Sequence, residues 1–85
     1  MIAGYVLIQT EVGMATGVAA ALRKLPGVSA AASVAGPYDV IVRAEARSID
    51  QLGRLVVSRV QATAGVLRTI TCPIISRSKV GPGGP

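Results

Sequence analysis

The sequence contains an internal repeat. Each half begins with a strand-like segment opened by a tyrosine, continues with helical periodicity, and ends in a Gly-Val step that leads into another strand-like segment. The tyrosines are Tyr5 and Tyr38, and the Gly-Val steps are Gly27-Val28 and Gly65-Val66. Because crossovers in βαβ units are right-handed, two such units interleave into a four-stranded antiparallel sheet with both helices on one face. The repeat therefore predicts the order βαββαβ and an α+β, ferredoxin-like fold.

Four strands and two helices account for most of the chain. Runs of β-branched residues with alternating side chains predict strands, and apolar residues spaced three or four apart predict helices. We expect strands at 3–10, 28–35, 38–46 and 66–75, and helices at 14–25 and 48–64. The apolar residues expected to pack against the sheet are Met14, Val18, Leu22 and Leu25 in the first helix and Ile49, Leu52, Leu55, Val56 and Val60 in the second.

Local signals mark the ends of these elements. Pro26 and Gly27 end the first helix, since proline cannot continue the hydrogen-bonded ladder and glycine accepts a left-handed backbone. Ser48 and Gln51 fit a capping box at the start of the second helix. Pro73 lacks a donor N–H, which predicts an edge position or a bulge for the last strand.

The apolar content exceeds what one small core can hide. The 85 residues make one domain, and a chain of this size buries only about 60–65% of the surface that its unfolded form exposes. Yet 51% of the residues are hydrophobic, and the first strand is apolar on both faces, with Tyr5 and Leu7 on one and Val6 and Ile8 on the other. Two helices cover only one face of a sheet. We therefore expect a second copy to cover the other face, which gives a dimeric α/β barrel.

The chain lacks residues that several classes of function require. The chain has no histidine, and histidine is the commonest general base and metal ligand. Its carboxylates, Glu11, Asp39, Glu45 and Asp50, are not paired at the spacing of an acid/base or metal site. Gly-rich phosphate loops are missing as well. We therefore expect no enzyme, no catalytic residues, no metal and no cofactor.

Charge and targeting signals argue against nucleic acid and membranes as partners. The formal charge of +5 is spread along the chain, and base-stacking aromatics are missing, so solvated surface charges are favoured over a nucleic-acid footprint. No apolar run approaches the roughly 20 residues that span a bilayer, and no secretory signal is apparent. The single cysteine, Cys72, fits a reducing compartment and is expected to pack in the core. We expect a cytoplasmic protein whose residues 77–85 form a flexible tail.

Three segments carry a resemblance to one family. They read LPGV at 25–28, SVAGPYDVIVRAEA at 33–46 and AGVLRTITCPI at 64–74. Together with the order βαββαβ they resemble the Lrp/AsnC ligand-binding domain, also called RAM, for regulation of amino acid metabolism. The resemblance covers 3–75, and we assign the domain to residues 1–76. It implies a module of transcriptional regulation that senses small effectors, usually amino acids.

The resemblance also implies an assembly. Members of the family pair through their sheets, and the dimers associate into rings, often octamers. Effectors bind in clefts between dimers, near the turn that joins the second and third strands. Full-length relatives carry a helix-turn-helix DNA-binding domain ahead of this module. Here the first strand begins at about Ala3, so the chain looks like a stand-alone version, for which we expect no direct DNA binding; mixed assembly with full-length relatives is a hypothesis.

The turn at Gly36-Pro37 holds residues that are scarce in this chain, namely Tyr38 and Asp39. A free amino acid carries an ammonium and a carboxylate on one carbon. Asp39 can pair with the ammonium, and backbone N–H groups around Gly36 and Tyr38 can hold the carboxylate. The last strand offers two threonine hydroxyls on one face. The predicted ligand-binding residues are Ala35, Gly36, Pro37, Tyr38, Asp39, Thr69 and Thr71.

Structural roles are open for the same residues. Asp39 can bond to nearby backbone, as aspartate does in turns. Tyr38 can be a core or interface residue with one wet end, and Thr69 and Thr71 are good strand formers. Two other functions also stay open. One is a structural subunit that co-assembles with full-length relatives without a ligand, which mixed oligomers lacking an effector response would favour. The other is a small dimeric α/β-barrel enzyme of the monooxygenase type, which a deep polar cavity within the subunit would favour.

Overall fold

The chain forms one sheet covered by two helices. The computed structural model describes residues 1–75, so the predicted tail at 77–85 lies outside the described residues. The elements are β1 (Ile2–Thr10), α1 (Ala15–Arg23), β2 (Val28–Ser33), β3 (Val40–Ala46), α2 (Ile49–Leu55), a π-helical turn η1 (Val56–Val60) and β4 (Val66–Pro73). This order confirms the predicted βαββαβ arrangement and the ferredoxin-like α+β fold.

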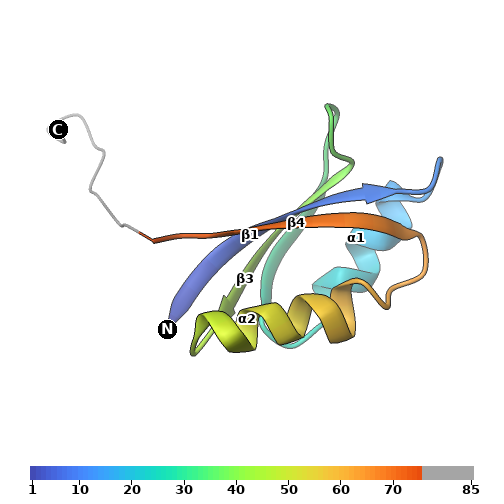
Figure 1. The fold of residues 1–85 in the computed structure, drawn as a ribbon. Helices are drawn as coiled ribbons and strands as arrows, with labels where there is room; N and C mark the ends of the chain where they lie inside the picture. The colour runs from blue at the N-terminus through green and yellow to red at the C-terminus, as the bar shows by residue number, and fades with distance from the viewer. Residues whose placement is uncertain (76–85) are drawn as a thin grey trace, which may run out of the picture.

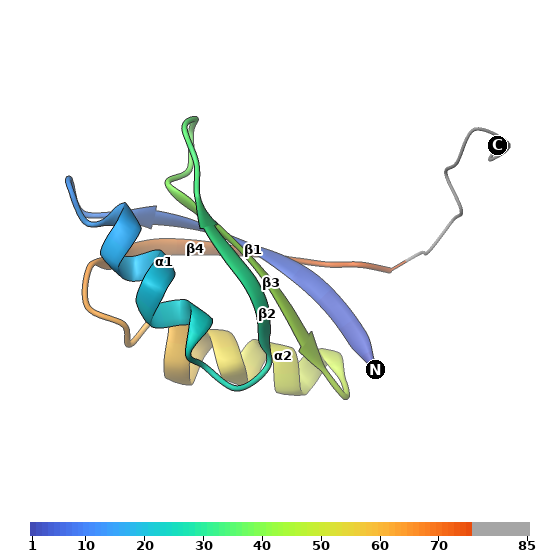
Figure 2. The ribbon, with the colours of Figure 1, turned by 180° about the vertical axis from the view of Figure 1, so that it is seen from behind.

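The sheet is antiparallel throughout, with the strand order β2-β3-β1-β4. Both helices lie on the same side of it, and its other side is open (Figures 1 and 2). Pro73 lies in β4, an edge strand, as its missing N–H predicted. At the opposite edge, Arg23 Nε donates a hydrogen bond of 2.9 Å to the carbonyl oxygen of Ala31 in β2. This contact occupies an acceptor near an unpaired strand edge, where further strands would otherwise add.

The helices decide which face of each strand is buried. In β1, Val6 and Ile8 are 1% and 0% exposed beneath the helices, whereas Tyr5 on the other face is 43% exposed. The buried face continues into the neighbouring strand β3 and packs against the two helices. The other fully buried large side chains of this core are those of Val18, Leu22, Val40, Val42, Leu52 and Val60.

The second helix widens after its second turn. The N–H of Gln61 donates to the carbonyl oxygen of Val56 over 2.8 Å, a bond that spans five residues. In an α-helix, each residue is rotated about the axis by about 40° relative to the residue four positions earlier. The wider turn reduces this rotation. Leu52, Val56 and Val60 therefore stay on the sheet side and are all buried.

The two Gly-Val steps have the same backbone conformation, as the repeat predicts. Gly27 and Gly65 follow the two helices with φ of +90° and +93°. A side chain strains such a conformation, because a Cβ then crowds the following carbonyl oxygen. A Cβ on Gly65 would also lie 2.8 Å from Met14 Cε and 3.0 Å from Val18 Cγ2. Glycine at this position is therefore needed for both the turn and the packing of α1.

The predicted capping box is present in part. Ser48 Oγ accepts a hydrogen bond of 3.2 Å from the N–H of Gln51, as expected. The side chain of Gln51 accepts from the N–H of Arg47, one residue before the position that a capping box uses. Both bonds tie the β3–α2 connection to the first turn of the helix.

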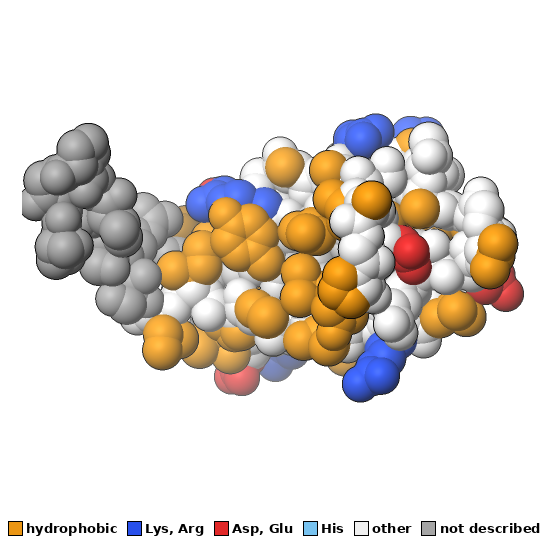
Figure 3. Space-filling model, turned by 90° about the horizontal axis from the view of Figure 1, so that it is seen from above, with side chains coloured by type: hydrophobic (Ala, Val, Ile, Leu, Met, Phe, Trp, Pro, Cys, Tyr) orange, Lys and Arg blue, Asp and Glu red, His pale blue; other side chains and the backbone are white. Residues whose placement is uncertain are grey.

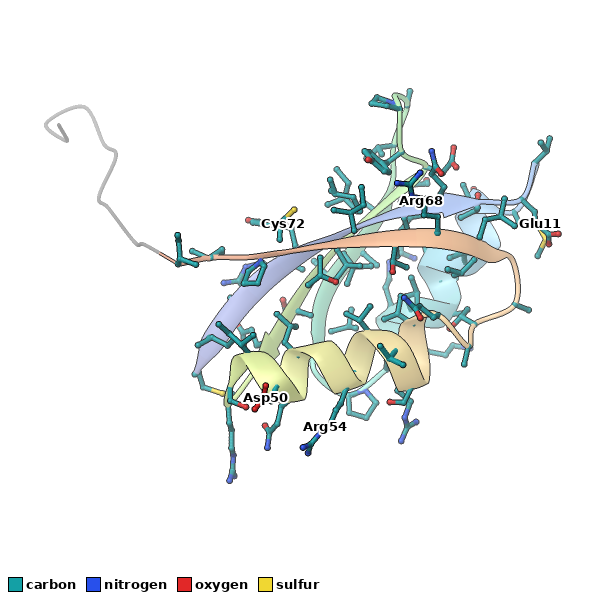
Figure 4. All side chains as sticks on the ribbon, in the orientation of Figure 1. Glu11, Asp50, Arg54, Arg68 and Cys72 are labelled. Atoms are coloured by element: carbon teal, nitrogen blue, oxygen red, sulfur yellow. The ribbon has the colours of Figure 1, made fainter. Side chains whose placement is uncertain are left out.

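Three predictions of burial are wrong. Met14, expected on the apolar stripe of the first helix, lies just before α1 and is 37% exposed. Cys72 is exposed, because it lies opposite Tyr5 in the β1–β4 ladder and therefore points to the open face of the sheet. Figure 4 shows its side chain on the side away from the helices. Ile49 is 59% exposed although its spacing places it on the apolar stripe. It is the first residue of α2, and helical side chains tilt toward the N-terminus, so its side chain projects past the covered part of the sheet.

Candidate functional site

Five of the predicted site residues, Ala35 to Asp39, form the loop between β2 and β3. The loop projects beyond the end of the sheet (Figure 1). It is longer than the two-residue turn expected from the sequence, because β2 ends at Ser33 and β3 begins at Val40. Ala35, Gly36 and Pro37 are exposed, and Tyr38 and Asp39 are half-buried. The loop therefore presents backbone and one aromatic ring to solvent at a single end of the molecule.

Asp39 holds this loop to β1. Its N–H donates to the carbonyl oxygen of Ile8 and its carbonyl oxygen accepts from Val34 N–H, both over 2.9 Å. Its Oδ2 accepts from the N–H of Thr10 over 2.9 Å. The carboxylate thus replaces a backbone carbonyl at the point where β3 has not yet begun. The other oxygen, Oδ1, takes part in no hydrogen bond recorded among residues 1–75.

We expect Asp39→Ala to lower the free energy of unfolding by about 1–2 kcal/mol, because it leaves the half-buried N–H of Thr10 without its acceptor. Asp39→Asn keeps an oxygen at the same place and should cost less. Urea unfolding followed by circular dichroism measures both. Glu11→Ala, which removes an exposed carboxylate next to Thr10, is the control and should stay within about 0.5 kcal/mol of wild type. An Asp39→Ala protein as stable as that control would show that the bond does not stabilise the loop.

Thr69 and Thr71 lie on the helix side of β4. They stand opposite Ile8 and Val6, which are buried beneath the helices. Gln61 Nε2 donates a hydrogen bond of 2.9 Å to Thr69 Oγ1. The two threonines line a groove of about 360 Å³ between the second helix and the edge strand. Its other lining residues are Ile49, Leu52, Gly53, Val56, Val57, Gln61 and Pro73.

A single chain does not gather the seven predicted residues into one pocket. The loop lies beside β1 through Asp39 and Ile8, and Thr69 lies opposite Ile8 on the other side of β1. Two strand spacings, about 10 Å, therefore separate the backbones of Asp39 and Thr69. The groove is lined by both threonines and by none of the loop residues. The prediction thus resolves into two separate surfaces.

Gln61 is a site candidate that sequence reasoning missed. Its position on the predicted helix places it among the residues that face water, and it is largely exposed. The wide turn η1 brings its amide to Thr69. Because a π turn has no clear signature in the sequence, the contact follows only from the structure.

The open face of the sheet is a third feature. It carries apolar side chains across neighbouring strands, with Leu7 of β1 between Ile41 of β3 and Ile70 of β4. Figure 3 views the molecule from this side and shows apolar side chains gathered over the sheet. Tyr5 and Cys72 extend the surface toward one end. Such a continuous apolar surface is typical of a protein–protein interface.

One ion pair interrupts this apolar face. Arg43 Nη1 lies 2.6 Å from Glu45 Oε2 and also donates to Ser29 Oγ over 3.2 Å. The hydrogen bond with Glu45 raises the pKa of Arg43 above its ordinary value. Arg43 therefore stays charged at any working pH, and its charge is compensated within the chain.

The sequence belongs to the Lrp/AsnC ligand-binding domain family, whose sequence model matches residues 3–83. This is a family of regulatory domains rather than enzymes. A comparison with curated proteins gives no match. Family membership confirms the resemblance carried by the three sequence segments.

Solved structures agree with this assignment. A protein from Thermus thermophilus is 28% identical, with a TM-score of 0.87 over 93% of this chain and 99% of that protein. A hypothetical protein from Pyrococcus horikoshii is 26% identical, with a TM-score of 0.81 over 91% of this chain and 93% of that one. Both are small proteins matched over nearly their whole length.

A transcriptional regulator from Neisseria meningitidis, solved in complex with L-methionine, shares the fold. The identity is 17% and the TM-score is 0.80, over 99% of this chain and 56% of the regulator. The present chain thus corresponds to about half of that protein.

The described part of the chain also lacks two further features. Residues 1–75 hold no group of three or more His, Cys, Asp or Glu side chains arranged for a metal ion. Within the same range, neither helix has the length and apolar character that crossing a membrane requires.

Proposed function

We propose that the protein is a regulatory module that binds a small amino acid effector. Membership of the Lrp/AsnC ligand-binding domain family supports this proposal most directly. The Neisseria regulator with the same fold was solved with L-methionine, which is an amino acid of the expected class. The two polar surfaces described above offer the groups that such a ligand requires.

The proposed site is composite, formed where the β2–β3 loop of one copy meets the α2–β4 groove of another. The loop contributes Asp39, whose Oδ1 is available to an ammonium group. Since Thr69 Oγ1 accepts from Gln61, its own hydroxyl hydrogen can be donated to a ligand carboxylate. The apolar side chains of Leu52, Val56 and Pro73 in the groove suit an aliphatic side chain. The loop thus supplies a partner for the ligand ammonium, and the groove supplies a hydrogen-bond donor for the ligand carboxylate.

Assembly is part of the proposal. The open sheet face would be buried against the same face of a second copy, because water-exposed apolar area of this kind favours association. Pairing of dimers into a ring would then create clefts between copies. The fold that the chain shares with longer regulators also supports the hypothesis of mixed assembly with them.

Binding is tested by thermal shift and calorimetry with each of the common amino acids. We expect at least one to raise Tm by several degrees at saturating concentration, since a ligand that binds only the folded state stabilises it. Asp39→Asn should weaken binding at least about tenfold, because it removes the charge while keeping an acceptor for Thr10. Thr71→Val, which replaces one hydroxyl in the groove by a methyl, should weaken it as well.

The matched control for Asp39→Asn is Glu11→Gln, which removes the same charge from an exposed side chain next to Thr10 in the sequence. It should bind like the wild-type protein. The site assignment is wrong if Asp39→Asn and Glu11→Gln bind equally well. The proposed function is wrong if no amino acid binds at millimolar concentration.

A further inference from the structure

The helix wall of the α2–β4 groove has a gap at Gly53. Ile49 lies one turn before it and Val57 one turn after it, and both side chains are largely exposed, at 59% and 64%. Gly53 lines the groove and also a shallow hollow of about 710 Å³ next to it on the helix surface. Because glycine has no side chain, the wall of the groove is lower at this point than at the two aliphatic residues beside it.

Neither the backbone nor the packing of residues 1–75 requires a glycine at this position. Gly53 lies inside α2 with an ordinary helical backbone and is not among the glycines with a positive φ. A Cβ built on it meets no atom of the described chain within 4 Å. Since alanine is more favourable than glycine inside a helix, the glycine lowers stability without a reason in the fold. A bound molecule that occupies the open space gives such a reason.

Gly53 lies at the apolar end of the groove. Its neighbour Leu52 and Pro73 of β4 both approach Gly4 in β1, where a Cβ would lie 3.0 Å from Leu52 Cδ2 and 3.2 Å from Pro73 Cα. Leu52 and Pro73 therefore lie close to each other at this end. The residues that line the groove include no charged side chain. This end of the groove therefore suits an uncharged, aliphatic group.

The opposite end of the groove is polar. There Gln61 Nε2 donates to Thr69 Oγ1 over 2.9 Å. Gln61 follows Gly53 by eight residues, which corresponds to about 12 Å along the helix. On β4, Thr71 lies about 7 Å from both Thr69 and Pro73 along the strand. An amino acid whose carboxylate accepts from the threonine hydroxyls therefore leaves the apolar end of the groove to its side chain.

We propose that Gly53 is a specificity-determining residue, which leaves room for the end of the effector side chain. This inference rests on the proposed function and narrows the effector to amino acids with a long, uncharged aliphatic side chain. At about 1.2 Å per bond of an extended chain, a side chain of four non-hydrogen atoms covers about 5 Å and reaches from the threonines toward Gly53. Shorter side chains leave the space at Gly53 empty, and a methyl group on Gly53 would fill it.

A series of straight-chain amino acids tests this role, because its members differ by one CH₂ group each. The series is alanine, α-aminobutyrate, norvaline and norleucine, and calorimetry gives the Kd of each. For the wild-type protein, Kd should fall about fourfold with each added CH₂ group. In Gly53→Ala the Kd of norleucine should rise at least about tenfold, because the new methyl group takes the space of the last part of the side chain. The Kd of alanine should stay that of the wild-type protein.

Gly17→Ala is the matched control. Gly17 also lies inside a helix, α1, and a Cβ on it meets nothing within 4 Å. It is not among the residues that line the α2–β4 groove. Both substitutions should raise Tm by about 4 °C, because alanine favours the helix, and this rise verifies that both variants fold. Only Gly53→Ala should change the ratio of the Kd values for norleucine and alanine.

Three results overturn this role of Gly53 and leave the proposed function standing. The first is a norleucine Kd that is the same in Gly53→Ala and Gly17→Ala. The second is an equal loss of alanine and norleucine binding in Gly53→Ala, because the glycine would then make room for the loop of the other copy. The third is a wild-type protein that prefers alanine or a charged amino acid to norleucine. A wild-type protein that binds no amino acid at millimolar concentration overturns both proposals.

Discussion

The Leu7→Arg protein should show no sheet-to-sheet dimer at concentrations at which the wild-type protein is paired through its sheets. Leu7 is half-buried at the centre of the open face, between Ile41 and Ile70. In a sheet-to-sheet dimer its replacement buries a charge without a partner, which costs several kcal/mol. A loss of this size raises the dissociation constant at least about 100-fold. Sedimentation at about 10 µM measures the change.

The fold should survive this substitution, because the side chain of Leu7 points away from the core that the helices cover. Far-ultraviolet circular dichroism and Tm verify this. Val12→Arg adds the same charge at a fully exposed residue outside the sheet and should leave the dimer intact. Ile70→Glu provides a second disruption with the opposite charge. Wild-type protein that is monomeric at this concentration, or Leu7→Arg protein that dimerises like Val12→Arg, would contradict pairing through the open face.

The repeat was sufficient to predict the order of elements, because each half has its own local signals. Gly27 and Gly65 end the helices with left-handed backbones, and the strands follow directly, as expected. Alternation in β1 also separated Tyr5 and Leu7 from Val6 and Ile8. It did not say which pair faces the helices, since both are apolar. Only the packing of α1 and α2 selects Val6 and Ile8 for the core.

The incorrect prediction for Cys72 concerns a side chain whose surroundings depend on the pairing register of the strands. Cys72 is apolar enough for a core, but its place opposite Tyr5 puts it on the open face. Similarly, Thr69 and Thr71 share one face, as their spacing predicts, yet composition does not indicate that this face looks toward the second helix. Register between β1 and β4 is a long-range property, so a single sequence constrains it weakly.

The candidate site depends on the same kind of information. The sequence identified Asp39 as unusual and left a backbone contact and a ligand contact open. The structure adds that one carboxylate oxygen bonds to Thr10 N–H, which accounts for an aspartate at this position without any ligand. A structural role for one oxygen leaves the other for binding, so the two roles do not exclude each other. The comparison of Asp39→Ala with Asp39→Asn separates them, because only the second keeps the backbone contact.

Gly65→Ala should be the most destabilising of the glycine substitutions, with a loss of about 3 kcal/mol in the free energy of unfolding. Two effects add. The left-handed backbone at φ +93° disfavours any side chain, and the new methyl group would lie 3.0 Å from Val18 Cγ2 and 2.8 Å from Met14 Cε. Met14 lies at the partly exposed start of α1 and can move, whereas Val18 is 1% exposed and cannot move without disturbing the core.

Gly13→Ala is a matched control for this substitution. Gly13 has a similar φ of +81°, but a Cβ there meets nothing within 4 Å. It should therefore lose only the backbone contribution, about 1 kcal/mol. Urea unfolding of both variants, compared at equal protein concentration because association shifts apparent stability, gives the packing contribution by difference. Equal losses of unfolding free energy for Gly13→Ala and Gly65→Ala would mean that α1 moves to accommodate the methyl group without cost. Glycine at position 65 would then be needed only for the backbone conformation of the turn.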